Sequence, residues 1–174
     1  MTAPTTPAAG ALPHQGPAAG TTPRTRRRPK DIGTAAETAV VRTLTQLGFP
    51  HAERRALAGA YDLGDITGTP GIVWEVKGGR QTKAPSDEQI AAWMAETEVE
   101  RRNAGADIGV LVLQRHGVGP KNADRWWAYL RAQHVMTVHP AGPDFPVRVQ
   151  LAHASLLLRG IGYGQPLDPE AVGR

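Results

Sequence analysis

The chain contains no cysteine, and its opening segment contains neither an acidic residue nor a long apolar run. A chain without cysteine forms no disulfide and no thiolate zinc site, which fits a cytoplasmic protein. The opening segment has the features of neither a secretory signal nor a membrane span, so we expect no membrane partner. The histidines show no HxxxH or similar spacing and predict no histidine metal site.

Positive charge is concentrated at the start of the chain. The 174 residues carry a net charge of +4, whereas residues 1–30 carry +5, so the rest of the chain carries about −1. Residues 1–30 are also rich in Pro, Ala and Gly, which predicts a disordered basic tail. Such a tail either contacts phosphates without sequence preference or only keeps the chain in solution. We expect one folded domain at residues 31–160 and a C-terminal tail at residues 161–174.

Residues 72–76, Ile-Val-Trp-Glu-Val, predict a β-strand, because turn-forming residues lie on both sides of them. Side chains alternate between the two faces of a strand, so Ile72, Trp74 and Val76 form one apolar face. Glu75 and Lys77 share the opposite face. An acid and a lysine two residues apart can be a simple exposed salt bridge, or they can belong to a site.

A second acid precedes this strand. Asp65 lies in a Gly-Asp-Ile sequence, just before Thr67 and a Gly-Thr-Pro-Gly turn. This order predicts a short hairpin of two antiparallel strands. In such a hairpin the carboxylates of Asp65 and Glu75 lie side by side.

Two neighbouring carboxylates and a lysine can form a magnesium site. Magnesium takes oxygen ligands and keeps several waters, so one or two carboxylates suffice. Asp65 and Glu75 are the candidate ligands, with the carbonyl of Val76 as a further one, and manganese can substitute for magnesium. Lys77 can orient a water or stabilise charge on a phosphate under attack.

A helix is predicted before the site, over residues 31–47, with Gly48 as its C-terminal stop. Glu37 lies on the apolar stripe of this helix, where a carboxylate needs a partner. Glu37 is therefore either a fourth residue of the site or the partner of Thr34 in a capping box.

A second helix is predicted after the site, from Ser86 to about residue 103 or 105, with one apolar face formed by Ile90, Trp93, Met94 and Thr97. Gln89 lies in its first turn, either near the metal site or in a capping box with Ser86. The apolar run at residues 108–114 predicts a central buried strand. Residues 126–129 form either a strand or a helix capped by Asn122, residues 147–151 an edge strand, and residues 152–159 a short helix.

Five residues around the candidate site are predicted to bind DNA: Arg54, Arg55, Arg80, Lys83 and Gln89. The two arginines at 54 and 55 precede Asp65, and the two basic residues at 80 and 83 lie in a Gly-rich, mobile-looking loop after the strand. The alternative is that these charges are solvated surface.

Together these residues resemble the PD-(D/E)xK nuclease superfamily, over about residues 31–130. The resemblance rests on Glu37, the Gly-Asp-Ile and Glu-Val-Lys sequences, the Ser-x-x-Gln helix and the apolar strand. It is strongest to the archaeal-type Holliday junction resolvases and their phage relatives. Gly64 stands where the superfamily name has Pro, a difference that the resolvase branch tolerates. The resemblance implies an α/β fold with a restriction-endonuclease-like core, a mixed central β-sheet flanked by helices.

The resemblance also implies that Glu37, Asp65, Glu75 and Lys77 are the metal-binding and catalytic residues of a homodimer that cuts two DNA strands symmetrically. We therefore expect a magnesium-dependent DNA endonuclease, a Holliday junction resolvase that acts on branched DNA in recombination or repair. A restriction-like or repair-type endonuclease of duplex or flap DNA is the alternative among enzymes. A DNA-binding module without catalysis is the alternative from another class.

Overall fold

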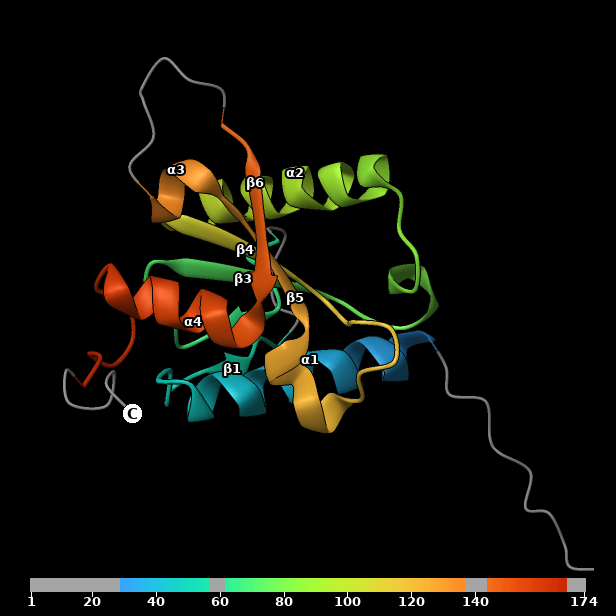
Figure 1. Ribbon diagram of the computed structural model, residues 1–174, viewed down its shortest axis with the longest axis horizontal. Coiled ribbons are helices and arrows are strands. Elements are labelled where there is room, and N and C mark those ends of the chain that lie inside the picture. Colours follow the sequence, from blue (N-terminus) through green and yellow to red (C-terminus); the bar gives the residue numbers. More distant parts are fainter. Residues whose placement is uncertain (1–28, 57–61, 137–143, 169–174) are drawn as a thin grey trace, which may run out of the picture.

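The computed structural model describes residues 29–56, 62–136 and 144–168. Helices and strands are mixed along the chain, as Figure 1 shows. In chain order they are α1 (Pro29–Gln46), β1 (Glu53–Arg54), β2 (Ile66–Thr67), β3 (Ile72–Lys77), the 3-10 helix η1 (Arg80–Thr82), α2 (Asp87–Asn103), β4 (Ile108–Leu113), the 3-10 helix η2 (Pro120–Arg125), β5 (Trp127–Arg131), α3 (Ala132–Val135), β6 (Pro146–Gln150) and α4 (Leu151–Gly160).

A mixed four-stranded sheet forms the centre of the fold, in the order β3-β4-β5-β6. β3 and β4 are parallel, whereas β5 and β6 are each antiparallel to the strand before. Every residue of β4 is buried, which explains its continuous apolar sequence, because both faces of a central strand are covered. The expected α/β fold with a mixed sheet flanked by helices is confirmed, and so is the buried strand expected at residues 108–114.

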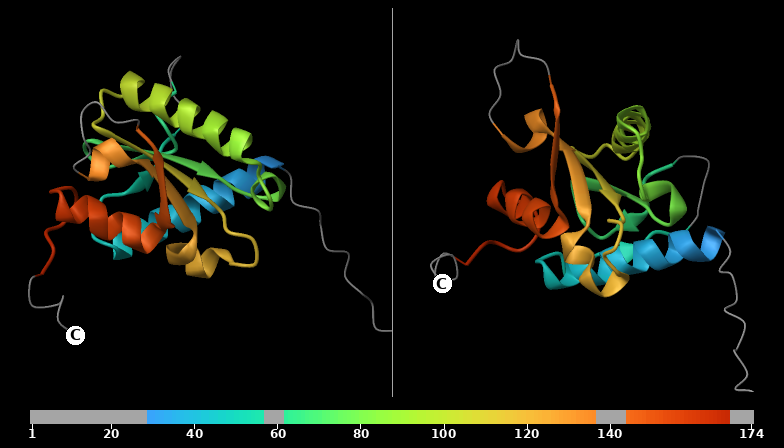
Figure 2. Two further views of the ribbon diagram at one scale, coloured as in Figure 1. Left: turned by 45° about the horizontal axis from the view of Figure 1, so that its top comes forward. Right: turned by 45° about the vertical axis from the view of Figure 1, so that its right-hand side comes forward.

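Helices cover both faces of this sheet (Figures 1 and 2). α1 and α4 lie on one face, over a core that contains the fully buried Trp74 and Leu130. α2 lies on the other face, where Trp93 belongs to a smaller core with Leu111. The alternation expected for β3 is confirmed, because Trp74 packs on the α1 side while Glu75 turns toward α2. Among the described residues, no helix combines the length and the apolar character needed to cross a membrane.

The first helix begins earlier than the sequence predicts. α1 starts at Pro29, so Thr34 lies inside the helix, where its carbonyl accepts a hydrogen bond from Thr38 Oγ1 (2.7 Å). Only the first turn of a helix leaves backbone N–H groups free for a cap. The capping box expected for Thr34 and Glu37 is therefore wrong. The expected stop is confirmed, since Gly48 follows the helix with a φ of +99°.

The segment before β3 forms a two-stranded ribbon with β1 instead of the expected hairpin with β3. Glu53 of β1 pairs with Thr67 of β2, and β2 is not a strand of the four-stranded sheet. A backbone hydrogen bond from Asp65 N–H to the carbonyl of Trp74 (2.8 Å) ties the ribbon to β3. The expected antiparallel ladder is therefore wrong, but Asp65 still reaches β3.

The later elements mostly follow the sequence. The hydroxyl of Ser86 accepts a hydrogen bond from the N–H of Gln89 (3.2 Å), as expected for the start of α2. Residues 127–131 form β5, so the alternative of a helix capped by Asn122 is wrong. β6 is the edge strand and α4 the short helix that the sequence predicts.

The two predicted tails fall partly outside the described residues. Residues 1–28 lie outside them, and Pro29 and Lys30 already belong to α1. At the other end, residues 161–168 pack against the fold, because Gln165 N–H donates to the carbonyl of Gly48 (2.8 Å). Tyr163 also donates from its hydroxyl to Asp107 (3.0 Å). The domain boundaries expected from the sequence stay a prediction.

Gly68 and Gly105 share a positive φ but differ in how closely other atoms approach them. Gly68 and Gly105 have positive φ values of 77° and 60°, a conformation that costs other residues roughly 1 to 2 kcal/mol. A Cβ at Gly68 would lie 1.7 Å from the carbonyl oxygen of His51, whereas one at Gly105 meets no atom within 4 Å. We expect Gly68→Ala to lower the free energy of unfolding by more than about 3 kcal/mol and Gly105→Ala by about 1 kcal/mol, measured by urea denaturation. Equal losses would contradict this packing.

Candidate active site

Glu75 and Lys77 project from β3 toward α2. Lys77 Nζ lies 2.6 Å from Glu75 Oε1 and 3.1 Å from Glu96 Oε2 on α2. Glu75 is only 8% exposed, and the Lys77 side chain is 19% exposed. The interpretation as an exposed salt bridge on a solvated strand is therefore wrong. Glu75 is buried and Lys77 is partly buried, a setting in which charges need more than one partner to be stable.

Asp65 is held against the open edge of β3. Its N–H donates to the carbonyl of Trp74 and its carboxylate Oδ2 accepts from the N–H of Val76, both at 2.8 Å. These backbone groups can bind Asp65 because β3 is an edge strand of the sheet. The carboxyl groups of Asp65 and Glu75 are close enough to act on each other's pKa, so the expected neighbourhood of the two acids is confirmed. Val76 contributes its N–H here, and ligation by its carbonyl stays a prediction.

Gly64 is needed for the backbone path into the site. Its φ is +83°, and a Cβ there would lie 2.7 Å from Cγ1 of Val73. Proline has a φ fixed near −65° by its ring. The chain could not enter Asp65 by this path with proline at position 64, which is a physical reason for glycine before Asp65.

Glu100 of α2 is a third carboxylate at the site, and it was not among the residues predicted from the sequence. It is 5% exposed, and its charge acts on Glu75. Four residues of a helix advance about 6 Å and two residues of a strand about 6.6 Å. α2 therefore places Glu96 beside Lys77 and Glu100 beside Glu75. A signal was present, since Glu100 continues the apolar stripe of α2 three residues after Thr97.

Glu37 reaches the site from α1, where an arginine holds it. Its Oε2 accepts hydrogen bonds from Arg54 Nε (2.8 Å) and Nη2 (2.7 Å), and its charge acts on Asp65. Arg55 Nε donates to the carbonyl of Gly64 (3.1 Å). Arg54 and Arg55, two of the three arginines predicted to bind DNA, thus make contacts inside the protein that position Glu37 and the segment before Asp65.

The three carboxyl groups hold protons more tightly than ordinary acids. Burial and then the charge of Glu75 raise the pKa of Asp65 to about 7. Burial and the charge of Glu100 raise the pKa of Glu75 to about 7, although Lys77 acts in the opposite direction. Burial, with the charges of Asp62 and Asp65, raises the pKa of Glu100 to about 7. Without a cation, protonation stabilises this cluster.

Lys77 stays an ammonium group in this environment. Burial lowers its pKa, but hydrogen bonds and charge from Glu75 and Glu96 outweigh burial, so the pKa of Lys77 lies above its ordinary value. An ammonium donates hydrogen bonds and stabilises negative charge. It does not accept a proton near neutral pH, which argues for an electrostatic role over that of a general base.

Asp65 and Glu75 supply carboxylate oxygens, the kind of ligand that a divalent cation such as magnesium prefers. The charge of Glu75 acts on Asp65 and raises its pKa, and a cation near both carboxylates would offset that repulsion and replace protons. Within residues 29–56, 62–136 and 144–168, no three Asp, Glu or His side chains stand ready to hold a metal ion together. Magnesium does not need three, because one or two carboxylates hold it while water completes the shell.

The other predicted DNA-binding residues lie near the C-terminal end of β3. Arg80 and Lys83 are exposed, but residues 80–82 form the 3-10 helix η1 with a buried Thr82. The mobility expected for this Gly-rich loop stays a prediction. Gln89 is exposed, and its N–H is used by the cap of α2.

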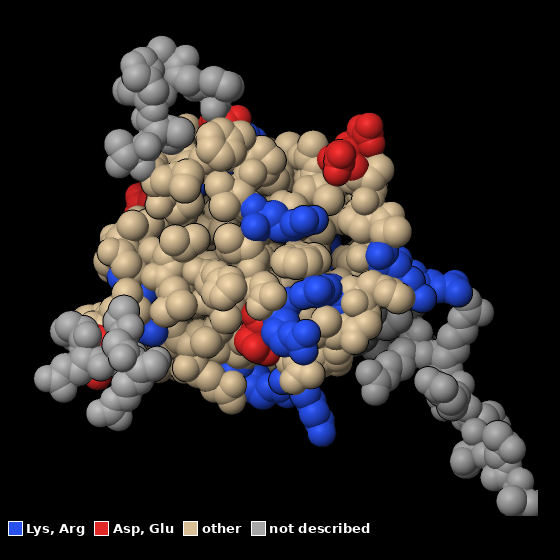
Figure 3. Space-filling view, in the orientation of Figure 1, with Lys and Arg blue, Asp and Glu red and all other residues tan. Residues whose placement is uncertain are grey.

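Two arginines that were not predicted flank Trp127 of β5. The guanidinium groups of Arg115 and Arg148 lie 4.4 and 4.9 Å from the centre of a Trp127 ring. Lys77 pairs with Leu113, and Leu113 pairs with Trp127, so Trp127 lies two strand spacings, about 10 Å, from Lys77 across the sheet. Figure 3 shows Lys and Arg side chains in a discontinuous band over β5, β6 and η2.

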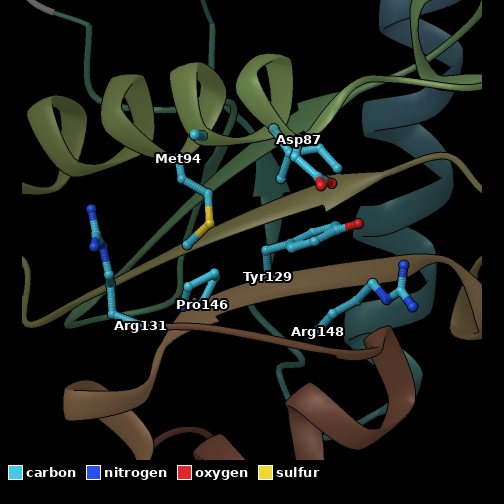
Figure 4. Close-up of a pocket in the computed structure, with 8 residues that line it drawn as sticks. Asp87, Met94, Tyr129, Arg131, Pro146 and Arg148 are labelled. Carbon is cyan, nitrogen blue, oxygen red and sulfur yellow. The ribbon is translucent and has the colours of Figure 1, made fainter. Parts of the chain in front are cut away.

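A groove of about 340 Å³ lies between α2 and the strands β5 and β6, and Arg148 contributes to its lining. Met94 and Tyr129 contribute to its apolar part, and Asp87, Arg131 and Arg148 are the charged residues around it (Figure 4). The lining includes no residue of the carboxylate cluster. This groove is therefore separate from the candidate active site.

No protein-family model, curated protein or solved structure matches this chain. Arguments about function therefore rest on the geometry and chemistry of the site.

The pKa values predict how the stability of the metal-free protein changes with pH. Asp65, Glu75 and Glu100 have pKa values of about 7 in the folded protein and about 4 in an unfolded chain. Between these values the folded protein binds more protons than the unfolded chain, so stability falls as the pH rises. We expect a lower Tm at pH 8 than at pH 5 in EDTA. The free energy of unfolding should fall between these pH values by an amount on the order of a few kcal/mol.

Added magnesium should raise the Tm strongly at pH 8 and weakly at pH 5, because it replaces protons that are present at the lower pH. The measurement is calorimetry of the full chain at both pH values with EDTA or magnesium. Asp65→Asn removes one of the three raised acids and should weaken both responses without abolishing them. A Tm in EDTA that rises from pH 5 to pH 8 would contradict the raised pKa values.

Proposed function

We propose that this protein is a metal-dependent endodeoxyribonuclease that hydrolyses phosphodiester bonds, with branched DNA such as a four-way junction as its first-choice substrate. The observation that carries the proposal is the position of Asp65 and the Lys77–Glu75 ion pair around the buried Glu75, at the open edge of β3. The restriction-endonuclease-like core belongs to the same proposal. It is supported by the order of α1, the ribbon, β3, α2 and β4 along the chain.

Asp65 and Glu75 are the proposed ligands of magnesium or manganese, with the Val76 carbonyl as a further one. A bound divalent cation supplies Lewis-acid chemistry, because it stabilises charge on the phosphate and makes water more acidic. The hydrogen bond from Val76 N–H fixes one oxygen of Asp65, so the orientation of this carboxylate is set before substrate arrives.

Lys77 is the proposed electrostatic catalyst of the in-line attack. Its ammonium group lies within 2.6 Å of Glu75, so it sits beside the proposed metal ligands. There it can orient the attacking water and stabilise the negative charge that develops on the phosphate oxygens. Glu37 completes the site through water or through Arg54, since its carboxylate is bound by that arginine.

A DNA duplex or junction is much larger than the site and needs further contacts. Arg80 and Lys83 are exposed at the end of β3 nearest to Lys77. Arg115 and Arg148 add two guanidinium groups that Trp127 holds by stacking. Stacking leaves the N–H groups of a guanidinium free in its plane, where they can bind phosphate oxygens.

Two other functions are compatible with parts of the site. A restriction-like or repair-type endonuclease would use the same residues on ordinary duplex or flap DNA, and symmetric cutting of a junction further requires two copies of the chain. A non-catalytic DNA-binding module would need no buried carboxylates. Burying several acids together is costly, and this cost favours the enzyme.

Cleavage of defined DNA substrates tests the proposed activity. We expect the purified full chain to cut a labelled four-way junction symmetrically with magnesium or manganese and not with EDTA. Flap and linear duplex DNA should be cut less. Glu75→Ala should abolish cutting, and Lys77→Ala should slow it by about 100- to 1,000-fold, the usual effect of losing one donor to a developing charge.

Electrophoretic mobility shifts measured with the same DNA separate binding from chemistry, and Lys77→Ala should still bind. Comparable cutting of linear duplex would replace the resolvase by a general endonuclease. Binding of DNA without cutting under any divalent metal would favour the non-catalytic module.

The stacked arginines give a second test, of the DNA-binding surface. We expect Arg148→Ala to weaken binding and raise KM with little change in kcat, because Arg148 lies away from the carboxylates. The slope of log affinity against log salt should fall by about 0.9 for each lost phosphate contact. Arg42→Ala is the matched control, since Arg42 lies on α1 and bonds the carbonyl of Pro120. Equal effects of the two variants would exclude a specific role for Arg148.

A further inference from the structure

Glu100 has a carboxylate oxygen that the fold leaves without a partner. Oε2 of Glu100 is buried and has no hydrogen-bond partner among the described residues. An unpaired buried acceptor carries a desolvation cost of about 1 to 3 kcal/mol, and more when it is charged. Glu100 is only 5% exposed, so bulk water does not supply the missing hydrogen bond. The position therefore requires an explanation.

The surroundings of Glu100 are acidic. Its carboxyl group contacts that of Glu75, and the charges of Asp62 and Asp65 also act on it. Lys77 is the cation that acts on Glu100, but its ammonium group forms its ion pairs with Glu75 and Glu96. The arginine that follows Glu100 is held by Glu98 and by the carbonyl of Ala106.

We propose that Glu100 is a metal-ligating residue, which together with Glu75 binds a divalent cation on the α2 side of the site. This inference rests on the proposed magnesium or manganese site at Asp65 and Glu75, and it extends that site by a ligand from a third element. Two carboxylates are enough for magnesium or manganese, whose other positions are filled by water or phosphate oxygen. The free oxygen of Glu100 gains its missing partner when the cation binds.

A purely structural role makes a different prediction. If Glu100 serves only as a neutral acid that donates a hydrogen bond to Glu75, glutamine can replace it, because an amide N–H donates in the same place. If Glu100 binds a cation, glutamine removes the charge and a strong ligand. The variant Glu100→Gln has nearly the same shape as the wild type and separates these roles.

The test is titration of the metal-free full chain with manganese alone, followed by calorimetry and by the electron paramagnetic resonance signal of free manganese. We expect Glu100→Gln to lose one bound manganese per chain or to bind its manganese about tenfold more weakly or worse. Glu100→Ala should behave in the same way, and circular dichroism of both variants checks their fold. The same number and affinity of manganese ions as in the wild type would overturn the proposal.

Glu96→Gln is the matched control. Glu96 lies one turn earlier on α2, contacts Lys77 and has a side chain that is 54% exposed, so its loss should leave manganese binding unchanged. An equal loss in Glu96→Gln would indicate a general effect of negative charge and would also overturn the proposal. Manganese binding that depends on Glu100 in a protein that cuts no DNA would preserve this inference while the proposed nuclease function fails. If the protein cuts DNA but Glu100→Gln binds manganese as the wild type does, the proposed nuclease function holds and the role of Glu100 as a ligand is excluded.

Discussion

The close burial of acidic side chains beside one lysine is the constraint on which the site depends. Asp65 precedes β2, Glu75 lies on β3 and Glu100 on α2, and the charge of Lys77 acts on Glu75 and Glu100. A carboxylate that stays in water avoids the desolvation cost of burial. Burial, and then the charges of neighbouring acids, raise the pKa of all three to about 7, and a divalent cation would offset that repulsion. This is why the geometry points to metal chemistry.

The edge position of β3 makes this convergence possible. A central strand would have used the carbonyl of Trp74 and the N–H of Val76 in its own ladder, whereas here both bind Asp65. β3 also separates two environments, because Trp74 lies in the main core while Glu75 lies beneath α2. The acids therefore gather at an open edge of the sheet, where a large polyanion can approach.

The sequence predicted the parts of the site that local periodicity controls. Alternation placed Glu75 and Lys77 on one face of a strand, and their neighbour Asp65 followed from the short turn between them. Long-range packing decided the rest. Thr34 could not cap a helix that starts at Pro29, and β2 pairs with β1 because residues 53–54 return beside it. Glu100 was missed because an acid in a helix usually faces water, although its spacing from Thr97 puts it on the buried stripe.

The central claim is that Asp65 and Glu75 bind a divalent cation, and diffraction from crystals containing manganese tests it most directly. The account predicts an anomalous difference peak about 2.0 to 2.3 Å from a carboxylate oxygen of each residue at pH 8. Crystals grown with manganese at pH 8 that show no such peak would contradict it.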